Sequence, residues 1–212
     1  MIISVAIASY NGEKYIKKQI DSIINQTRRV DEIIISDDGS TDDTIKIIDD
    51  ISCSCSNEIR IVVLINEKKH GYCGNFENAI ANAKGDIIFL ADQDDLWMPD
   101  KVEKVLQVFE SHSDCNMVMT NGNIIDKDDI IIKNELTANF RVENHLMHLD
   151  GMEWLEYSVS SCLCNWMCIA LSKPLLSEAF PFPPLTGVHD HWLEFITALT
   201  QGGYYLNRPL VQ

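Results

Sequence analysis

The stretch Phe89-Leu90-Ala91-Asp92-Gln93-Asp94-Asp95-Leu96-Trp97 places three carboxylates within four residues at the end of an apolar run. The run begins at Ile87, directly after Gly85-Asp86, and such a short apolar segment is typical of a buried strand in a parallel sheet. Ligands of open α/β sheets bind at the carboxyl ends of strands, and clustered carboxylates there suit Mg²⁺ or Mn²⁺. The alternative interpretation is a solvated acidic turn that caps the next helix, since Asp-rich turns are common.

The composition favours a folded domain that does not bind a nucleic-acid polymer. The chain has 212 residues, of which 46% are hydrophobic, so it is long enough for one large domain with a substantial core. Its formal net charge of -15 would repel DNA, RNA and anionic lipid. The apolar start, residues 1–8, is too short for a membrane span and lacks the basic region of a signal peptide. The seven cysteines lack paired C-x-x-C spacing, which favours a reduced, cytoplasmic protein.

Strand and helix patterns alternate through the first half of the chain. The expected strands cover residues 2–8, 32–36, 59–65, 87–90 and 117–120. The expected helices cover residues 13–25, 40–51, 72–83 and 99–109. This order predicts an α/β fold with a doubly wound, mostly parallel sheet flanked by helices.

The second half is less regular and forms a smaller portion of the fold. We expect a hairpin within residues 123–132, a mobile loop at 134–150 that closes over the ligand, and a short helix at 151–157. A strand at 167–171, a helix at 189–201 and a last strand from residue 204 follow. We interpret residues 1–212 as a single domain, with a ligand-binding half at 1–120 and a second half at 121–212. Because Gln212 follows neither a helix stop nor a polar tail, we expect the chain to be part of a longer protein.

Three polar clusters follow three of the predicted strands: Tyr10, the pair Asp37-Asp38, and the acidic stretch Asp92 to Asp95. An aromatic ring can stack on a base, a carboxylate can accept from a base or ribose, and a metal ion bound by carboxylates can neutralise a diphosphate. Together the clusters indicate a nucleoside diphosphate site. Taken singly, Tyr10 is equally a turn aromatic and Asp37-Asp38 a turn that caps a helix. The chain has neither a Walker loop nor a G-x-G-x-x-G loop.

The three motifs resemble a known enzyme family. The segments 4–12 (SVAIASYNG), 36–44 (SDDGSTDDT) and 92–97 (DQDDLW) are similar to those of GT-A-fold inverting glycosyltransferases that build bacterial surface polysaccharides. The form DQDDLW, together with the downstream segment 189–192 (HDHW), resembles the rhamnosyltransferase-like branch of that family. The resemblance extends over the whole chain, and the first three motifs together are highly specific.

The resemblance implies a role for particular residues. Tyr10 and Asp38 would hold the base and ribose, while Asp37 would support their loop. Asp92 and Asp94 would form the metal-binding pair for Mn²⁺ or Mg²⁺, with Asp92 also near the ribose. Asp190 would be the general base, although an acidic residue in the first turn of a helix is also favoured by the helix dipole alone. The remaining candidate substrate-binding residues are Ala8, Asn11, Glu13, Asn75 and Trp166.

Two departures from the family pattern affect these expectations. Trp166 lies where family members commonly have a small residue under the acceptor site, so it either shapes acceptor choice or is part of the core. Some relatives take a third metal ligand from a histidine that would lie beyond Gln212. His189 could substitute for it, although a plain helix-start histidine is the simpler interpretation. We therefore expect weak binding of a divalent metal.

The sequence thus predicts a metal-dependent glycosyltransferase, cytoplasmic or at the inner face of the membrane. It would move rhamnose or a hexose from a dTDP- or UDP-sugar donor to a glycan or lipid-linked acceptor. Peripheral membrane association would occur through the acceptor or a further C-terminal part. Two alternatives remain open: a non-catalytic sugar-nucleotide or glycan-binding module, and a sugar nucleotidyltransferase. The second would need a glycine-rich basic loop after the first strand, which residues 9–13 do not provide.

Overall fold

The computed structural model describes residues 1–55, 59–67, 71–134, 146–161, 168–184 and 187–212. The strands are β1 (Ile3–Ser9), β2 (Glu32–Asp37), β3 (Arg60–Ile65), β4 (Ile87–Asp92), β5 (Met117–Gly122), β6 (Ile124–Ile125), β7 (Ile131–Lys133), β8 (Leu146–Leu149), β9 (Ile169–Ser172) and β10 (Gly203–Val211). The helices are α1 (Ile16–Ile24), α2 (Thr44–Ser54), α3 (Tyr72–Asn82), α4 (Lys101–Ser111), α5 (Gly151–Ser161), α6 (Lys173–Ala179) and α7 (His189–Leu199).

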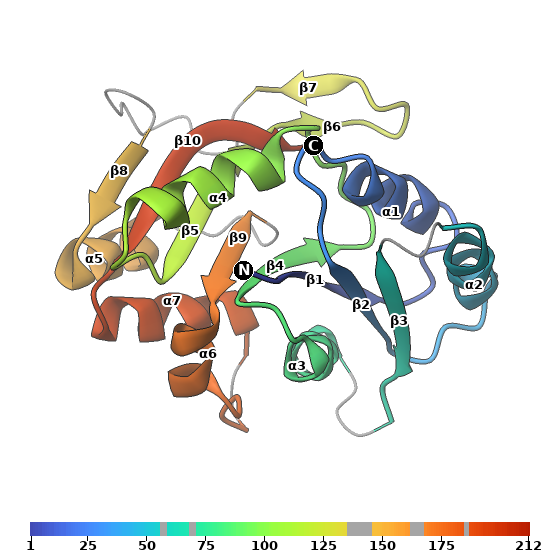
Figure 1. The fold of residues 1–212 in the computed structure, drawn as a ribbon, viewed down its shortest axis with the longest axis horizontal. Coiled ribbons are helices and arrows are strands. Elements are labelled where there is room, and N and C mark those ends of the chain that lie inside the picture. Colours follow the sequence, from blue (N-terminus) through green and yellow to red (C-terminus); the bar gives the residue numbers. More distant parts are fainter. Residues whose placement is uncertain (56–58, 68–70, 135–145, 162–167, 185–186) are drawn as a thin grey trace.

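The main sheet has the order β3-β2-β1-β4-β9-β5-β10-β8, as Figure 1 shows. Strands β1 to β4 are parallel, and β1 lies between β2 and β4. The register pairs Ser9 with Asp37 and Ala8 with Asp92, so the carboxyl ends of these strands lie at one edge of the sheet. The predicted α/β fold with a mostly parallel sheet is confirmed.

The second half of the sheet contains antiparallel strands that the sequence patterns did not predict. Strand β9 lies between β4 and β5 and is antiparallel to both. Strand β10 is parallel to β5, and β8 pairs antiparallel with its other edge. The prediction of a loop over residues 134–150 is wrong at residues 146–149, which form β8 because their backbone pairs with β10; residues 135–145 lie outside the described residues. The predicted hairpin is confirmed as the β6–β7 pair.

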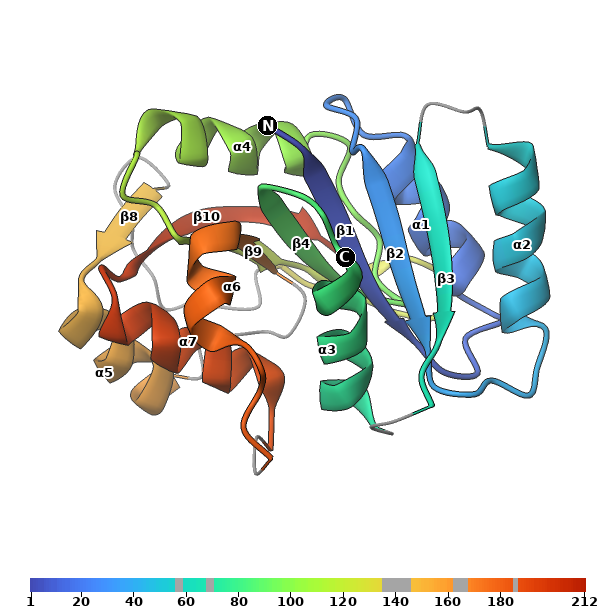
Figure 2. The ribbon, with the colours of Figure 1, turned by 60° about the horizontal axis from the view of Figure 1, so that its bottom comes forward.

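Helices cover both faces of the sheet (Figure 2). Helices α1, α2 and α4 pack on one face, where buried Ile20, Ile48 and Val105 contact the side chains of alternate strand residues. Helices α3, α5, α6 and α7 pack on the other face, for example through Phe76 and Leu193. Burial of each such side chain stabilises the fold by roughly 1.5–3 kcal/mol. Because both faces are covered, ligands have access to the sheet only along its edges.

Helix α6 is an element that the sequence analysis missed. Ser172 precedes it as N-cap, and its hydroxyl accepts a hydrogen bond from the backbone N–H of Leu175. Pro174 lies in the first turn, where a residue without an N–H is tolerated. Within the part of the chain that the structure describes, no helix has the length and apolar character needed to cross a membrane.

Candidate functional site

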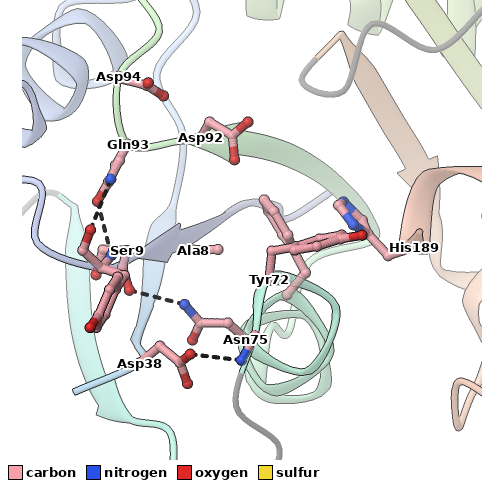
Figure 3. A pocket seen from close by; sticks show the side chains of 12 residues that line it. Ala8, Ser9, Asp38, Tyr72, Asn75, Asp92, Gln93, Asp94 and His189 are labelled. Carbon is pink, nitrogen blue, oxygen red and sulfur yellow. Dashed lines mark hydrogen bonds between the residues drawn. The ribbon is translucent and has the colours of Figure 1, made fainter. Parts of the chain in front are cut away.

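A cavity of about 490 Å³ opens at the edge where β1, β2 and β4 end (Figure 3). It receives side chains from the loops after these strands and from the starts of α3 and α7. The lining residues are Ala8, Ser9, Tyr10, Asp38, Gly71, Tyr72, Asn75, Phe76, Asp92, Gln93, Asp94 and His189. The structure therefore brings together Ala8, Tyr10, Asp38, Asn75, Asp92 and Asp94 of the predicted site residues.

Gln93 joins the loop after β1 to the acidic loop after β4. Its Oε1 accepts from the backbone N–H of Tyr10 at 2.9 Å, and its Nε2 donates to the Tyr10 carbonyl at 3.1 Å. Gly12 leaves room for this amide, since a Cβ at that position would lie 2.2 Å from Gln93 Oε1. The Tyr10 side chain is 55% exposed at the cavity, so its ring is available to a ligand.

Asp37 lies beneath the cavity and holds the next loop in place. Its side chain is fully buried and accepts from the hydroxyls of Ser9 and Ser40 at 2.7 and 2.6 Å. It also accepts from the backbone N–H groups of Gly39 and Ser40, at 3.1 and 2.7 Å. Asp37 does not line the cavity, so its carboxylate has no direct access to a ligand there.

Asn11 and Glu13, two further predicted binding residues, connect loops instead of lining the cavity. Asn11 Oδ1 accepts from the backbone N–H of Thr41 at 2.8 Å. Glu13 Oε2 accepts from the backbone N–H of Asp43 at 3.1 Å, at the start of α2. Both contacts hold the Tyr10 loop against the loop that carries Asp38.

Asp38 faces the cavity and is already partly engaged by the protein. Its Oδ1 accepts from Asn66 Nδ2 at 3.0 Å, and its Oδ2 accepts from the backbone N–H of Gly71 at 2.7 Å. Gly71 has φ +95°, a conformation that favours glycine and presents this N–H at the start of α3. Each carboxylate oxygen has a second lone pair, so Asp38 can still accept from a ligand.

Asp92 and Asp94 supply the negative charge of the cavity. Burial, followed by the charges of Asp95, Asp94 and Asp190, raises the pKa of Asp92 well above its usual range. A cation between these groups would favour the ionised carboxylate, as a nearby opposite charge does. Among the residues that the structure describes, no group of three or more His, Cys, Asp or Glu side chains is placed to hold a metal ion. The site therefore fits a cation that takes its remaining ligands from phosphate and water, as Mg²⁺ often does.

A buried cation stabilises the acidic loop from behind. Lys101 is 1% exposed, and its ammonium lies 4.0 Å from the centre of the Trp97 ring. Burial raises the pKa of Asp95 to about 7, and the Lys101 charge opposes this shift. The loop is also fixed by its backbone, because Leu96 N–H donates to the Gln212 carbonyl at 2.6 Å.

Asp190 and His189 begin α7 on the side of the cavity where Tyr72 lies (Figure 3 labels His189 and Tyr72). Asp190 is fully buried and does not line the cavity; its Oδ1 accepts from the backbone N–H of His191 at 3.0 Å, while its Oδ2 has no hydrogen-bond partner in the described chain. Burial raises the pKa of Asp190, against a smaller lowering by His191. The Asp190 charge also contributes to the raised pKa of Asp92. The two carboxylates are therefore close enough to interact electrostatically.

Comparison with protein families decides the classification. The model of glycosyl transferase family 2 matches residues 4–167 of the 212. The chain belongs to glycosyl transferase family 2. Among its relatives is an uncharacterised glycosyltransferase of Nostoc sp., 30% identical over 188 residues that make up 87% of the chain and 55% of that protein. The prediction of a glycosyltransferase is thus confirmed at the level of the family.

Two relatives of this family 2 glycosyltransferase carry more specific names. The chondroitin synthase of Escherichia coli is 35% identical over 63% of the chain and 19% of that protein. A UDP-Glc:α-D-GlcNAc-diphosphoundecaprenol β-1,3-glucosyltransferase, also of E. coli, is 26% identical over 85% of the chain and 64% of that protein. The chain thus spans less than two thirds of the length of these relatives.

Solved structures confirm the predicted GT-A fold. The structure of Staphylococcus aureus TarS in complex with UDP has a TM-score of 0.73 at 18% identity, covering 98% of this chain and 61% of that one. A mannosyltransferase from Pyrobaculum calidifontis, in complex with GDP-Man and Mn²⁺, has a TM-score of 0.68 at 16% identity, covering 98% and 54% of the two chains.

Two residues that line the cavity of this family 2 glycosyltransferase were not predicted as ligand-binding residues. Gln93 lies within the acidic motif, but its two contacts with Tyr10 depend on the packing of loops 83 residues apart. His189 has a ring that packs on Phe76 of α3, a contact between distant parts of the chain. Trp166, by contrast, was predicted to bind substrate and lies outside the described residues.

Proposed function

We propose that this chain carries the donor site and catalytic base of a metal-dependent, inverting glycosyltransferase. It would transfer rhamnose or a hexose from a dTDP- or UDP-sugar to a glycan or lipid-linked acceptor, in the synthesis of a surface polysaccharide. One observation carries the proposal: the sheet register brings Tyr10, Asp38 and Asp94 from three separate loops to one cavity. A UDP complex of a protein with the same fold and the name of the E. coli glucosyltransferase relative support a nucleotide-sugar donor.

In this proposal, the nucleoside binds at the Tyr10 and Asp38 side of the cavity. The half-exposed Tyr10 ring offers an apolar face for a base, and the Gln93 contacts hold its backbone in place. Asp38 would accept from a base N–H or a ribose hydroxyl while it remains bound to Asn66 and Gly71. Asp37, Asn11 and Glu13 would act indirectly, by fixing the loops that carry these groups.

Asp92 and Asp94 would hold Mn²⁺ or Mg²⁺ jointly with the donor diphosphate. The divalent cation would neutralise charge that develops on the departing diphosphate. Since the described residues offer no third protein ligand, metal affinity without nucleotide should be weak. The like charges around Asp92 make the same site unfavourable for an anion in the absence of the cation.

Asp190 would take the proton of the attacking acceptor hydroxyl. Burial raises its pKa, which moves the carboxylate towards the range in which a general base works best. Its unpartnered Oδ2 is the atom that would receive the proton. Attack on the face of the sugar opposite to the diphosphate would invert the anomeric centre. Residues 1–120 would then form the donor half and residues 121–212 the acceptor and base half, at the cytoplasmic face of the membrane where a lipid-linked acceptor is accessible.

The test measures the release of nucleotide diphosphate from a panel of dTDP- and UDP-sugars with Mn²⁺, with and without a lipid-linked acceptor fraction. Asp94→Asn and Asp190→Asn should each lower turnover at least about 100-fold, the lower range for loss of a catalytic base or a charge-stabilising group. Asp49→Asn, a change at an exposed position on α2, is the matched control. Full activity of either site variant would refute the assigned role. Donor binding without hydrolysis or transfer would instead identify a non-catalytic binding module.

A further inference from the structure

His189 presents two unused hydrogen-bonding atoms at the cavity. Its side chain is 1% exposed, and neither Nδ1 nor Nε2 has a hydrogen-bond partner within the described part of the chain. Buried polar atoms are normally paired, and one left unpaired is expected to have a reason such as an absent ligand. Because His189 lines the cavity, a ligand bound there can supply the partners.

The ring of His189 is held in position by aromatic packing. It stacks on Phe76 with ring centroids 4.2 Å apart and an angle of 21°, and the edge of Tyr72 lies against it at 6.2 Å. Figure 3 shows His189 beside Tyr72, across the cavity from Gln93. The imidazole is therefore fixed at the end of the cavity that lies away from the proposed nucleoside position.

A second unpaired atom lies at the same cavity. Asn75 is 2% exposed, and its Nδ2 donates to the Ser9 carbonyl at 3.0 Å. This bond fixes the amide orientation and leaves Oδ1 without a partner in the described residues. The cavity thus offers an acceptor on α3 and a ring on α7, both held by contacts that do not involve a ligand.

The chemistry of these atoms selects the class of ligand. Burial, with a smaller contribution from His191, lowers the pKa of His189 to about 4, so the ring is neutral near pH 7. A neutral imidazole has one donor and one acceptor, and Asn75 Oδ1 is an acceptor. A phosphate without protons can only accept, and the anionic surroundings disfavour it further. Sugar hydroxyls both donate and accept, so they match this set of atoms.

We propose that His189 and Asn75 form the subsite for the glycosyl group of the donor, in which the imidazole exchanges hydrogen bonds with sugar hydroxyls. This inference rests on the proposed function and adds a specificity-determining residue to it. His189 would act beside Asp190, so the same helix start would hold the sugar and the base. The described residues do not place His189 in a metal-binding group with Asp92 and Asp94, which argues against a role as metal ligand.

The experiment compares the binding of UDP with that of UDP-glucose and UDP-N-acetylglucosamine by isothermal titration calorimetry in the presence of Mn²⁺. The proteins are the unmodified chain, His189→Phe and His189→Gln. Phenylalanine keeps the stacking on Phe76 and removes both nitrogens, whereas glutamine keeps a donor and an acceptor. His189→Phe should leave the UDP affinity within about twofold and weaken the better-bound UDP-sugar about tenfold, as expected for the loss of two neutral hydrogen bonds. His189→Gln should recover part of the loss.

The outcomes separate this inference from the proposed function. Failure of UDP to bind the unmodified chain counts against the nucleotide site itself. An unchanged ratio of UDP to UDP-sugar affinity in His189→Phe overturns only the sugar subsite. Should the variants not fold, ¹⁵N NMR of the unmodified chain gives the answer through the imidazole that remains neutral at pH 5. Its ring nitrogen shifts should change with UDP-sugar beyond the change with UDP, and the absence of such a change refutes the subsite.

Discussion

Replacement of Asp37 by alanine tests whether this carboxylate holds the site together from below. Asp37 is fully buried and accepts four hydrogen bonds, two from serine hydroxyls and two from backbone N–H groups. The alanine variant leaves all four donors without this partner. At about 1 kcal/mol for each unpaired donor, the free energy of unfolding should fall by about 4 kcal/mol. For a domain of this size, that corresponds to a decrease in Tm of roughly 8–16 °C.

Urea denaturation at pH 7, followed by circular dichroism, measures this change. Asp49→Ala is the control, because Asp49 is an exposed aspartate on the neighbouring helix α2 and its replacement should change stability by less than about 0.5 kcal/mol. Asp37→Asn should lose only about 1 kcal/mol, since the amide oxygen keeps the backbone donors and the serine hydroxyls can accept from the amide nitrogen. A stability of Asp37→Ala within about 1 kcal/mol of the Asp49→Ala value would refute the reasoning.

Three further changes follow from contacts around the cavity. Gln93→Ala removes both bonds to Tyr10, so the affinity for UDP with Mn²⁺ should fall about 5- to 10-fold by titration calorimetry, and an unchanged affinity would show that these bonds do not order the loop. Because burial lowers the pKa of His189 to about 4, the unfolded chain gains a proton below about pH 6.5 that the folded chain gains only near pH 4; about 3 kcal/mol of stability should therefore be lost over this interval, and urea denaturation of His189→Phe should lack that part of the loss. Lys101→Met removes the charge that opposes the raised pKa of Asp95, so the variant should lose at least ~1 kcal/mol more relative to the parent chain at pH 8 than at pH 5, and an equal difference at both pH values would argue against the Lys101–Asp95 interaction.

The first half of the fold is predictable because its signals are local. The apolar runs of β1, β2 and β4 are bounded by polar turns, and the helices between them show a clear apolar face. The order of strands β3-β2-β1-β4 then follows from right-handed crossovers between parallel strands. The convergence of Tyr10, Asp38 and Asp94 is a consequence of this order, which is why a cavity could be expected from the sequence.

The second half depends on pairing between distant segments. Strand β9 inserts between β4 and β5, and the short β8 is stabilised by the backbone of β10, about sixty residues later in the chain. Four-residue strands carry little periodicity of their own, so their sequence does not distinguish them from loops. The same limit applies to helix α6, which has seven residues.

Within the site, adjacent residues have different environments that the sequence alone does not separate. Asp37 lies inside a hydrogen-bond network, while its neighbour Asp38 faces the cavity. His189 lines the cavity, while Asp190 is buried behind it. Motif matching identified the segments correctly, but the direction of each side chain depends on backbone geometry at the strand ends and helix starts.

The central claim is that three strand-end loops form one nucleoside diphosphate site. Titration of UDP in the presence of Mn²⁺ into the unmodified chain, Asp38→Ala and Asp49→Ala tests it most directly. We expect one site per chain, an affinity at least about tenfold weaker in Asp38→Ala, and no change in Asp49→Ala, because loss of a charged hydrogen-bond acceptor removes about 1.5–3 kcal/mol of binding free energy. The absence of UDP binding, or equal affinity of all three proteins, would contradict the account.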